Sequence, residues 1–187
     1  LSHIANLLLP SQPPAYKSSM EKSFHNSTGV LQADDPRLSE FTLFSGLDQQ
    51  ELATLLKLTD TVHVAAGEKI ISSGDPGHCL YLIISGSAVV TAKPPDESVE
   101  LARLKSGDFM GEIALVDDGP RSADVTALES CTLLRITRVT IGVLAGLKPS
   151  ASVQILSALG SELVKRLRIS NLKYIDLLHR TRGEVQA

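Results

Sequence analysis

The middle of the chain, residues 61–137, alternates between short apolar runs and turn residues. Seven runs have the length and composition of β-strands: Val62–Ala65, Lys69–Ser72, Leu80–Ile84, Ala88–Thr91, Val99–Leu104, Val125–Ala127 and Cys131–Ile136. Glycines and prolines separate these runs, for example at Gly67, Gly86 and Gly107. Many short strands at intervals of about 8–12 residues are typical of a sandwich or jelly roll and not of a parallel α/β sheet. Residues 111–115 interrupt the alternation and predict a single helical turn between strands.

Helical patterns flank this region on both sides. Residues 37–60 carry leucines at helical spacing, and Asp48 is placed to cap a helix that begins at Gln49 and ends near Asp60. Residues 1–36 are rich in Ser and Pro, and we interpret them as a tail or linker, with a short helix around residues 4–9 as an alternative.

Residues 138–187 predict two C-terminal helices. The first covers Val139–Leu147, and Pro149 suits the first turn of a longer second helix. In that second helix, positions spaced alternately three and four residues apart form a candidate coiled-coil seam: Val153, Leu156, Gly160, Leu163, Leu167, Ser170, Tyr174 and Leu177. This seam predicts a homodimer through the C-terminal helix, and a helix packed on its own domain is the alternative of equal weight.

Composition and charge exclude several classes of protein. The 187 residues are 43% hydrophobic, no uninterrupted apolar stretch approaches the ~18 residues of a membrane span, and the first residues lack a basic leader. Cys79 and Cys131 lie far apart, which favours buried thiols in a reducing compartment, so we expect a cytoplasmic protein. The first residue is Leu, so a fragment of a longer protein is one interpretation. The net charge is −3, but residues 135–187 alone carry +6, which we interpret first as a solvated helix face beside an acidic domain.

The candidate chemistry lies in residues 107–127. Gly111 precedes the predicted helical turn, whose first N–H groups form an anion site. Nine residues after Glu112 comes Arg121, whose planar guanidinium suits phosphate oxygens, while the Glu112 carboxylate can accept from a ribose hydroxyl. Together these groups fit a sugar phosphate. The alternative, with about equal weight, is a surface ion pair between Glu112 and Arg121.

These residues resemble the cyclic nucleotide-binding domain family. The resemblance extends from about Leu43 to Leu178 and is carried by the segments 43–47, 67–71, 80–86, 107–115 and 121–123. It implies a mainly β protein, a jelly-roll β-barrel with a short N-terminal helix and a long C-terminal helix, in which residues 107–127 are the phosphate-binding cassette. Its expected ligand is cyclic AMP or cyclic GMP, with no further cofactor, metal or catalytic residue.

The resemblance also implies roles for individual residues. Glu112 is expected to accept the ribose 2′-hydroxyl, and Arg121 to pair with the cyclic phosphate. Ser122 is expected to add a hydroxyl to the phosphate or the base, and the backbone N–H groups around Ile113 and Ala114 to cap the phosphate. Gly111 and Ala123 are also expected to contact the ligand. Val90, Leu101 and Leu104 are expected to line the sugar and base pocket, and Ser170 and Asn171 to reach the base. The pair Ser170-Asn171 favours cyclic AMP, whereas Ser122 is compatible with either nucleotide.

The functional hypothesis is therefore a non-enzymatic sensor. Ligand in the β-roll is expected to reposition the C-terminal helices and act on an unidentified effector. Because nine residues of this sequence follow Leu178, we expect no DNA-binding domain in it. Two alternatives remain open at this point: a dimeric scaffold that has lost its ligand, and the sensor domain of a larger channel, transporter or signalling enzyme.

Overall fold

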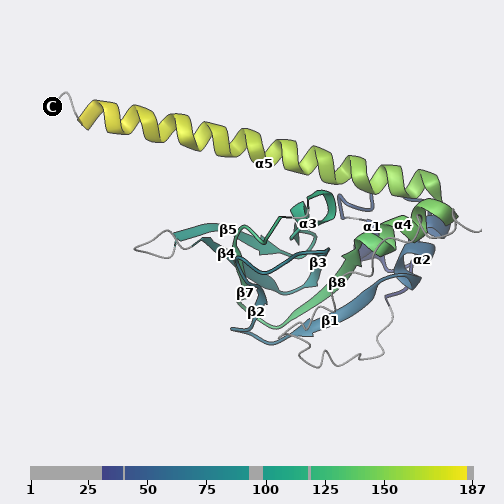
Figure 1. Ribbon diagram of the computed structural model, residues 1–187. Helices are drawn as coiled ribbons and strands as arrows, with labels where there is room; N and C mark the ends of the chain where they lie inside the picture. The colour runs from purple at the N-terminus through teal and green to yellow at the C-terminus, as the bar shows by residue number, and fades with distance from the viewer. Residues whose placement is uncertain (1–30, 40, 93–98, 118, 185–187) are drawn as a thin grey trace, which may run out of the picture.

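The strands of the computed structural model form two antiparallel sheets, and the structure describes residues 31–39, 41–92, 99–117 and 119–184 (Figure 1). Within these residues, one sheet has the strand order β1 (Asp60–Val64), β8 (Cys131–Thr137), β3 (Cys79–Ser85) and β6 (Phe109–Met110). The other has the order β2 (Lys69–Ile71), β7 (Asp124–Ala127), β4 (Ser87–Ala92) and β5 (Val99–Lys105). This is the expected jelly roll. All seven predicted strands are present, and β6 is an additional strand of two residues.

The inward faces of the two sheets share one apolar core. Residues such as Val62, Ile83 and Leu133 of the first sheet pack in the same cluster as Ala88 and Val125 of the second. The alternation of inward and outward side chains along each strand places these residues on one face.

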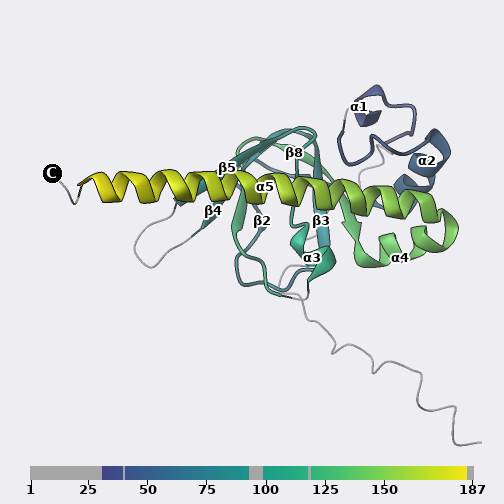
Figure 2. The same cartoon turned by 90° about the horizontal axis from the view of Figure 1, so that it is seen from above.

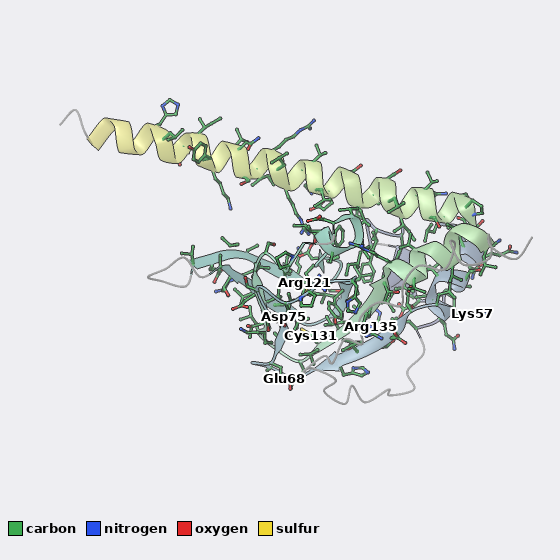
Figure 3. The ribbon with its side chains drawn as sticks, in the orientation of Figure 1. Lys57, Glu68, Asp75, Arg121, Cys131 and Arg135 are labelled. Carbon is green, nitrogen blue, oxygen red and sulfur yellow. The ribbon has the colours of Figure 1, made fainter. Side chains whose placement is uncertain are left out.

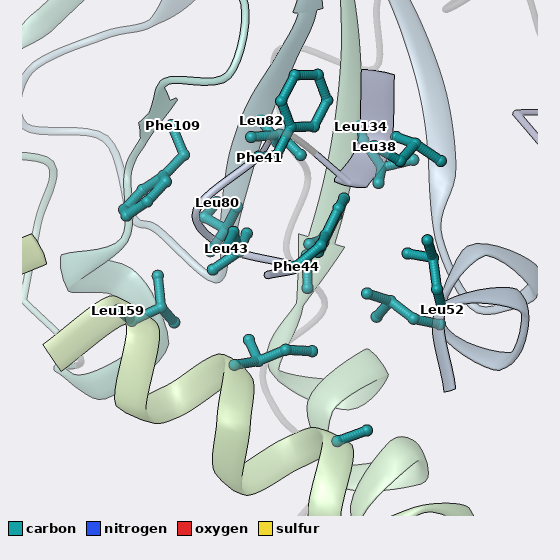
Figure 4. Packing of buried hydrophobic residues seen from close by; sticks show 14 of the residues in the cluster. Leu38, Phe41, Leu43, Phe44, Leu52, Leu80, Leu82, Phe109, Leu134 and Leu159 are labelled. Carbon is teal, nitrogen blue, oxygen red and sulfur yellow. The ribbon is translucent and has the colours of Figure 1, made fainter. Parts of the chain in front are cut away.

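A second core lies between the first sheet and the helices. Leu80 and Leu82 of β3 pack there with Phe41, Phe44 and, from the long C-terminal helix, Leu159 (Figure 4). The helices that contribute to it are α1 (Pro36–Ser39), α2 (Gln49–Lys57), α4 (Arg138–Leu147) and α5 (Pro149–Glu184). The roll and the helices are therefore joined by buried apolar surface.

The predicted cap of α2 is confirmed. The Asp48 carboxylate accepts a hydrogen bond of 2.7 Å from the Glu51 N–H, and the Glu51 carboxylate accepts one of 3.0 Å from the Asp48 N–H. The hydroxyl of Ser150 also donates to Glu51, which ties α2 to the beginning of α5. The helix ends at Lys57 and not near Asp60, because Asp60 already pairs with Arg135 in the register of β1 and β8.

The C-terminal helices are confirmed as a short α4 and a long α5 that begins at Pro149. Helix α5 crosses over α3 (Ile113–Val116) and over the strands, and its C-terminal part extends beyond them (Figures 1 and 2). The predicted tail lies mainly in residues 1–30, outside the described residues.

The exposed apolar side chains of α5 agree only in part with the predicted seam. Four apolar seam positions are exposed, Val153, Leu156, Leu167 and Tyr174, and so are positions outside it: Val164, Ile169, Leu172, Ile175 and Leu178. Leu163 is partly buried, and Ser170 faces the domain. The helix docks on the roll through the side that carries Leu163 and Ser170. The outward stripe of α5, which carries Val153, Val164, Ile175 and Leu178, is therefore rotated relative to the predicted seam.

Candidate functional site

A cavity of about 680 Å³ lies between α5 and the roll. This volume is typical of small-molecule sites, which occupy about 300–1,000 Å³. The strands supply mainly apolar walls, the cassette supplies polar groups, and α5 covers one side. The lining residues are Ile71, Val90, Leu101, Ala102, Leu104, Met110, Gly111, Glu112, Ile113, Arg121, Ser122, Ala123, Val125, Arg166, Leu167, Ile169, Ser170 and Lys173.

Most of the candidate site residues line this one cavity. Ala114 and Asn171 are the two that do not. The side chain of Ala114 is buried, and its N–H donates to the Gly111 carbonyl at 3.2 Å, so the turn itself uses that N–H. Asn171 is exposed and points away from the cavity, because one residue along a helix turns the side chain by about 100° from Ser170.

Arg121 is fixed by backbone carbonyl groups. Its Nη1 donates to the Gly111 carbonyl and its Nη2 to the Cys79 carbonyl, both at 2.9 Å. The side chain lies on the roll beneath α5 (Figure 3). In the described part of the chain no carboxylate pairs with Arg121, so its charge lacks a protein counter-ion.

Two glycines make room for this guanidinium. A Cβ on Gly77 would lie 2.8 Å from Arg121 Nε, and a Cβ on Gly111 would collide with Arg121 Nη1. Gly111 also has a φ of +77°, a conformation that L side chains rarely adopt. Glycine at residues 77 and 111 therefore leaves the space that the Arg121 guanidinium occupies.

Glu112 pairs with Arg166 of α5, and the alternative of a surface ion pair between Glu112 and Arg121 is wrong. The Glu112 side chain is only 8% exposed, and its Oε1 lies 3.1 Å from Arg166 Nη1. Arg166 Nη2 also donates to the Phe109 carbonyl at 2.9 Å, and its guanidinium lies 5.0 Å from the centre of the Phe109 ring. Glu112 pairs with Arg166 because α5 docks on the roll and places the Arg166 guanidinium beside the Glu112 carboxylate.

Arg166 and Lys173 are cavity residues that the sequence analysis missed. They flank Ser170 at intervals of four and three residues, so all three share one face of α5. Because Ser170 was already expected to reach the base, the residues three and four positions away on the same helix face could have been expected to line the cavity as well.

The described residues also give the state of the two cysteines and the results of a search for metal ligands and membrane spans. Cys79 and Cys131 are both buried free thiols, as predicted. In the described ranges, no cluster of three or more His, Cys, Asp or Glu side chains is suited to a metal ion. None of the described helices is both long and apolar enough to cross a membrane.

Comparison with known proteins agrees with this architecture. The family model of the cyclic nucleotide-binding domain matches residues 61–145. A cAMP-dependent protein kinase regulatory subunit from Emericella nidulans is 40% identical over 101 residues, which are 54% of this chain and 24% of that protein.

Two solved structures are similar over most of the chain. The catabolite activator protein of Thermus thermophilus is 32% identical with a TM-score of 0.65, and the match covers 73% of this chain and 62% of that one. The N-terminal domain of a transcriptional regulator from Streptomyces coelicolor A3(2) is 30% identical with a TM-score of 0.62, over 73% of this chain and 93% of that one.

The chain belongs to the cyclic nucleotide-binding domain family. It spans about a quarter of the fungal kinase subunit and less than two thirds of the Thermus protein, so the shared part is the domain and not the whole of these relatives.

Proposed function

We propose that this chain is a regulatory module that binds a cyclic nucleotide and has no enzymatic activity of its own. The observation that carries the proposal is the Arg121 guanidinium, which lines the cavity with two carbonyl partners and no paired carboxylate in the described residues. A partly buried cation without a counter-ion favours an anionic ligand. A cyclic phosphate supplies that charge.

The rest of the cavity suits the other parts of such a ligand. Glu112 is an acceptor for ribose hydroxyls, and Val90, Leu101 and Leu104 offer apolar surface to the sugar and base. Ser122 lines the same cavity and offers its hydroxyl to the phosphate or the base. We propose cyclic AMP as the preferred nucleotide, because the kinase regulatory subunit similar to this chain is named for cyclic AMP dependence. Ser170 can donate to and accept from the base edge.

The proposed output is a change in the position of the C-terminal helices. Two arginines connect the cassette to these helices: Arg138 at the start of α4 donates to the Ala114 carbonyl at 2.8 Å, and Arg166 of α5 contacts Glu112. A ligand shifts such an equilibrium only through different affinities for the two helix positions. The contacts of Arg138 and Arg166 with the cassette would supply this difference in affinity, because they depend on where the helices lie.

We also propose a homodimer through α5. The outward stripe of α5 contains Val153, which is 63% exposed, and Val164, which is 48% exposed. Gly160 and Asn171 continue the same stripe, and Val153, Val164 and Ile175 recur at intervals of 11 residues. A repeat of 11 residues corresponds to 3.67 residues per turn, so the paired helices are expected to cross as nearly straight helices or with a slight right-handed supercoil.

The location and partners follow from the same features. Two buried free thiols favour a reducing compartment, so we propose action in the cytoplasm. The effector, whether a separate protein or a further domain of a channel, transporter or signalling enzyme, would respond to the α5 position.

Isothermal titration tests the proposed function. The purified chain is titrated with cyclic AMP, cyclic GMP and linear 5′-AMP. We expect one site per chain, micromolar or tighter affinity for cyclic AMP, and much weaker binding of 5′-AMP. A folded, ligand-free chain that gives no heat with any of the three contradicts the proposal and favours the scaffold alternative.

A further inference from the structure

Asp124 in strand β7 has a buried carboxyl group that lies outside the cavity. Its neighbours Ala123 and Val125 line the cavity, whereas Asp124 does not, because side chains alternate along an extended segment. The Asp124 side chain is only 9% exposed. Its Oδ1 accepts a hydrogen bond of 2.7 Å from the Ser73 N–H, and its Oδ2 accepts one of 3.0 Å from Lys69 Nζ. Asp124 therefore joins β7 both to β2 and to the residues that follow β2.

Strand β2 gives these following residues little support of its own. It is the outer strand of its sheet, it has three residues, and its register with β7 shifts between Lys69 and Ile71. The strand ends at Ile71, and the Ser73 N–H two residues later is bound by the Asp124 side chain instead of by a neighbouring strand. The hydrogen bond to Asp124 thus takes the place of a strand pairing at this point.

Residues 72–78 form the loop between β2 and β3, and this loop holds the backbone of Arg121. The Gly74 N–H donates to the Arg121 carbonyl at 2.9 Å, and the Arg121 N–H donates to the Asp75 carbonyl at 2.8 Å. Residues 73–76 are exposed, and a Cβ on Gly74 would meet no atom within 4 Å, so packing contributes little to the position of the loop. The loop and the Arg121 backbone are held together by hydrogen bonds.

The same loop borders the Arg121 side chain. Gly77 is so close that a Cβ there would lie 2.8 Å from Arg121 Nε. The loop then leads into Cys79, whose carbonyl accepts from Arg121 Nη2 at 2.9 Å. A displacement of residues 72–78 would therefore change both the backbone position of Arg121 and the space around its guanidinium.

We infer that Asp124 is a positioning residue for the Arg121 guanidinium and, through it, for the phosphate of the ligand. It acts through the Ser73 N–H and the loop 72–78, and it does not itself line the cavity. The inference rests on the proposed function and adds to it a residue whose effect on binding passes through Arg121.

The test combines ligand affinity with a measurement that needs no ligand. Isothermal titration with cyclic AMP compares the unmodified chain with Asp124→Ala and Asp124→Asn. Amide hydrogen exchange of the ligand-free proteins is followed at Gly74 and Arg121 in the loop contact and at Leu133 in the core. Circular dichroism establishes that each variant is folded.

Asp60→Ala is the matched control. Asp60 joins the outer strand β1 of the other sheet to its neighbour β8, with Oδ2 at 2.7 Å from Arg135 Nη2, and it does not line the cavity. The substitution removes a carboxyl group and an ion pair between strands, as Asp124→Ala does, but at a distance in the fold from Arg121.

Asp124→Ala should lower the affinity for cyclic AMP by about tenfold, because misplacement of one binding group is costly. Asp124→Asn keeps an oxygen that accepts from the Ser73 N–H, so its affinity should stay within about threefold of the unmodified chain. In Asp124→Ala, exchange at Gly74 and Arg121 should accelerate more than exchange at Leu133, since the loop is released locally. Asp60→Ala should bind normally.

Two results would overturn the inference. Equal affinities of Asp124→Ala and the unmodified chain would show that Arg121 does not depend on this side chain. Equal losses of affinity in Asp124→Ala and Asp124→Asn, or equal acceleration of exchange at Gly74, Arg121 and Leu133, would show a general loss of stability without a specific effect on the loop.

Failure of the proposed function gives a different result. The unmodified chain then binds no cyclic AMP, which overturns the proposed function and the role of Asp124 in phosphate binding. Hydrogen exchange of the ligand-free proteins still decides whether Asp124 holds the loop 72–78 against Arg121.

Discussion

Gly111 and Arg121 are so closely packed that the backbone of one defines the position of the other. The Gly111 carbonyl accepts from Arg121 Nη1 at 2.9 Å, and a Cβ at residue 111 would overlap that same nitrogen. The positive φ of Gly111 adds a second reason for glycine at this position. The phosphate-binding group of the proposed site is thus placed by the turn that precedes α3.

Substitution of the other glycine beside Arg121 should therefore weaken ligand binding. Gly77 has no positive φ, but a Cβ there would lie 2.6 Å from Ala114 Cβ and 2.8 Å from Arg121 Nε. We expect Gly77→Ala to lower the affinity for cyclic AMP by about tenfold or more, the scale of a lost charge-assisted hydrogen bond. Isothermal titration measures the change.

Gly142→Ala is the matched control for this substitution. A Cβ at residue 142 of α4 meets nothing within 4 Å, so the variant should bind normally and gain up to about 1 kcal/mol of stability from helix propensity. Equal affinities in Gly77→Ala and Gly142→Ala would contradict the packing argument.

Loss of Arg138 should loosen the cassette from α4. Arg138 donates to the carbonyls of Ala114 and Asp117 at the end of α3. Without these bonds the last carbonyls of α3 lose a charged donor, so Arg138→Ala should lower the free energy of unfolding by about 1–2 kcal/mol. Urea unfolding measures the stability, and hydrogen exchange should become faster at residues 113–117.

Arg103→Ala provides the comparison for Arg138→Ala. Arg103 is exposed and pairs with Glu100 on the same strand, a contact worth little. Slower or unchanged exchange at α3 in Arg138→Ala would show that this arginine does not hold the cassette.

Lys173 should influence the choice of base. It lines the cavity from α5 and pairs with no carboxylate in the described residues. Its ammonium group only donates, while guanine offers both N7 and O6 as acceptors and adenine combines N7 with a donor amino group. We expect Lys173→Ala to weaken cyclic GMP more than cyclic AMP in a competition titration.

The control is Lys165→Ala, because Lys165 is exposed and pairs with Glu162 outside the cavity. If Lys173→Ala changes both nucleotides by the same factor, the lysine contributes general charge and no base selectivity.

If the chain dimerises through α5, charged substitutions in the outward stripe of this helix should dissociate the dimer. Val164→Glu together with Ile175→Glu places like charges in the seam, so sedimentation equilibrium should show a monomer. Lys165→Glu introduces the same residue beside the stripe and should remain dimeric. A monomeric unmodified chain, or a dimer that persists in the double variant, is incompatible with the α5 interface.

Stability should fall at alkaline pH because of Cys131. Burial raises the pKa of this thiol, so the folded chain keeps it protonated while the unfolded chain loses the proton above about pH 8.5. The resulting stabilisation is complete below that pH and is lost as the pH rises towards the folded pKa. Unfolding temperatures measured from pH 7 to 10 should decline less in Cys131→Ala than in the unmodified chain. If the unfolding temperatures of the two proteins decline equally with pH, Cys131 is not the cause of the lower stability at alkaline pH.

The sequence predicted the strands well, because a half-buried strand shows its inward and outward faces as an alternation of residues. The alternation within each strand and the Asp48 cap both depend on residues that are close in sequence. The short β6 was missed, because Phe109–Met110 carries too few residues for an alternation to appear.

The contacts of α5 could not be predicted in this way. Arg166 meets Glu112 across 54 residues of sequence, and no local pattern states how a long helix is rotated on a sheet. The same rotation explains why Ser170 lines the cavity while Asn171 does not. Periodicity identifies the faces of a helix, but packing decides which face is buried.

The most direct test of the central claim is the dissociation constant of cyclic AMP for the unmodified chain and for Arg121→Ala, measured by isothermal titration with Arg103→Ala as the control. We expect one site per chain, normal binding in the control, and a loss of about a hundredfold in Arg121→Ala, since a partly buried ion pair with phosphate is removed. Equal affinity in Arg121→Ala and the control would contradict the assignment of Arg121 as the phosphate-binding residue, and with it the proposed site.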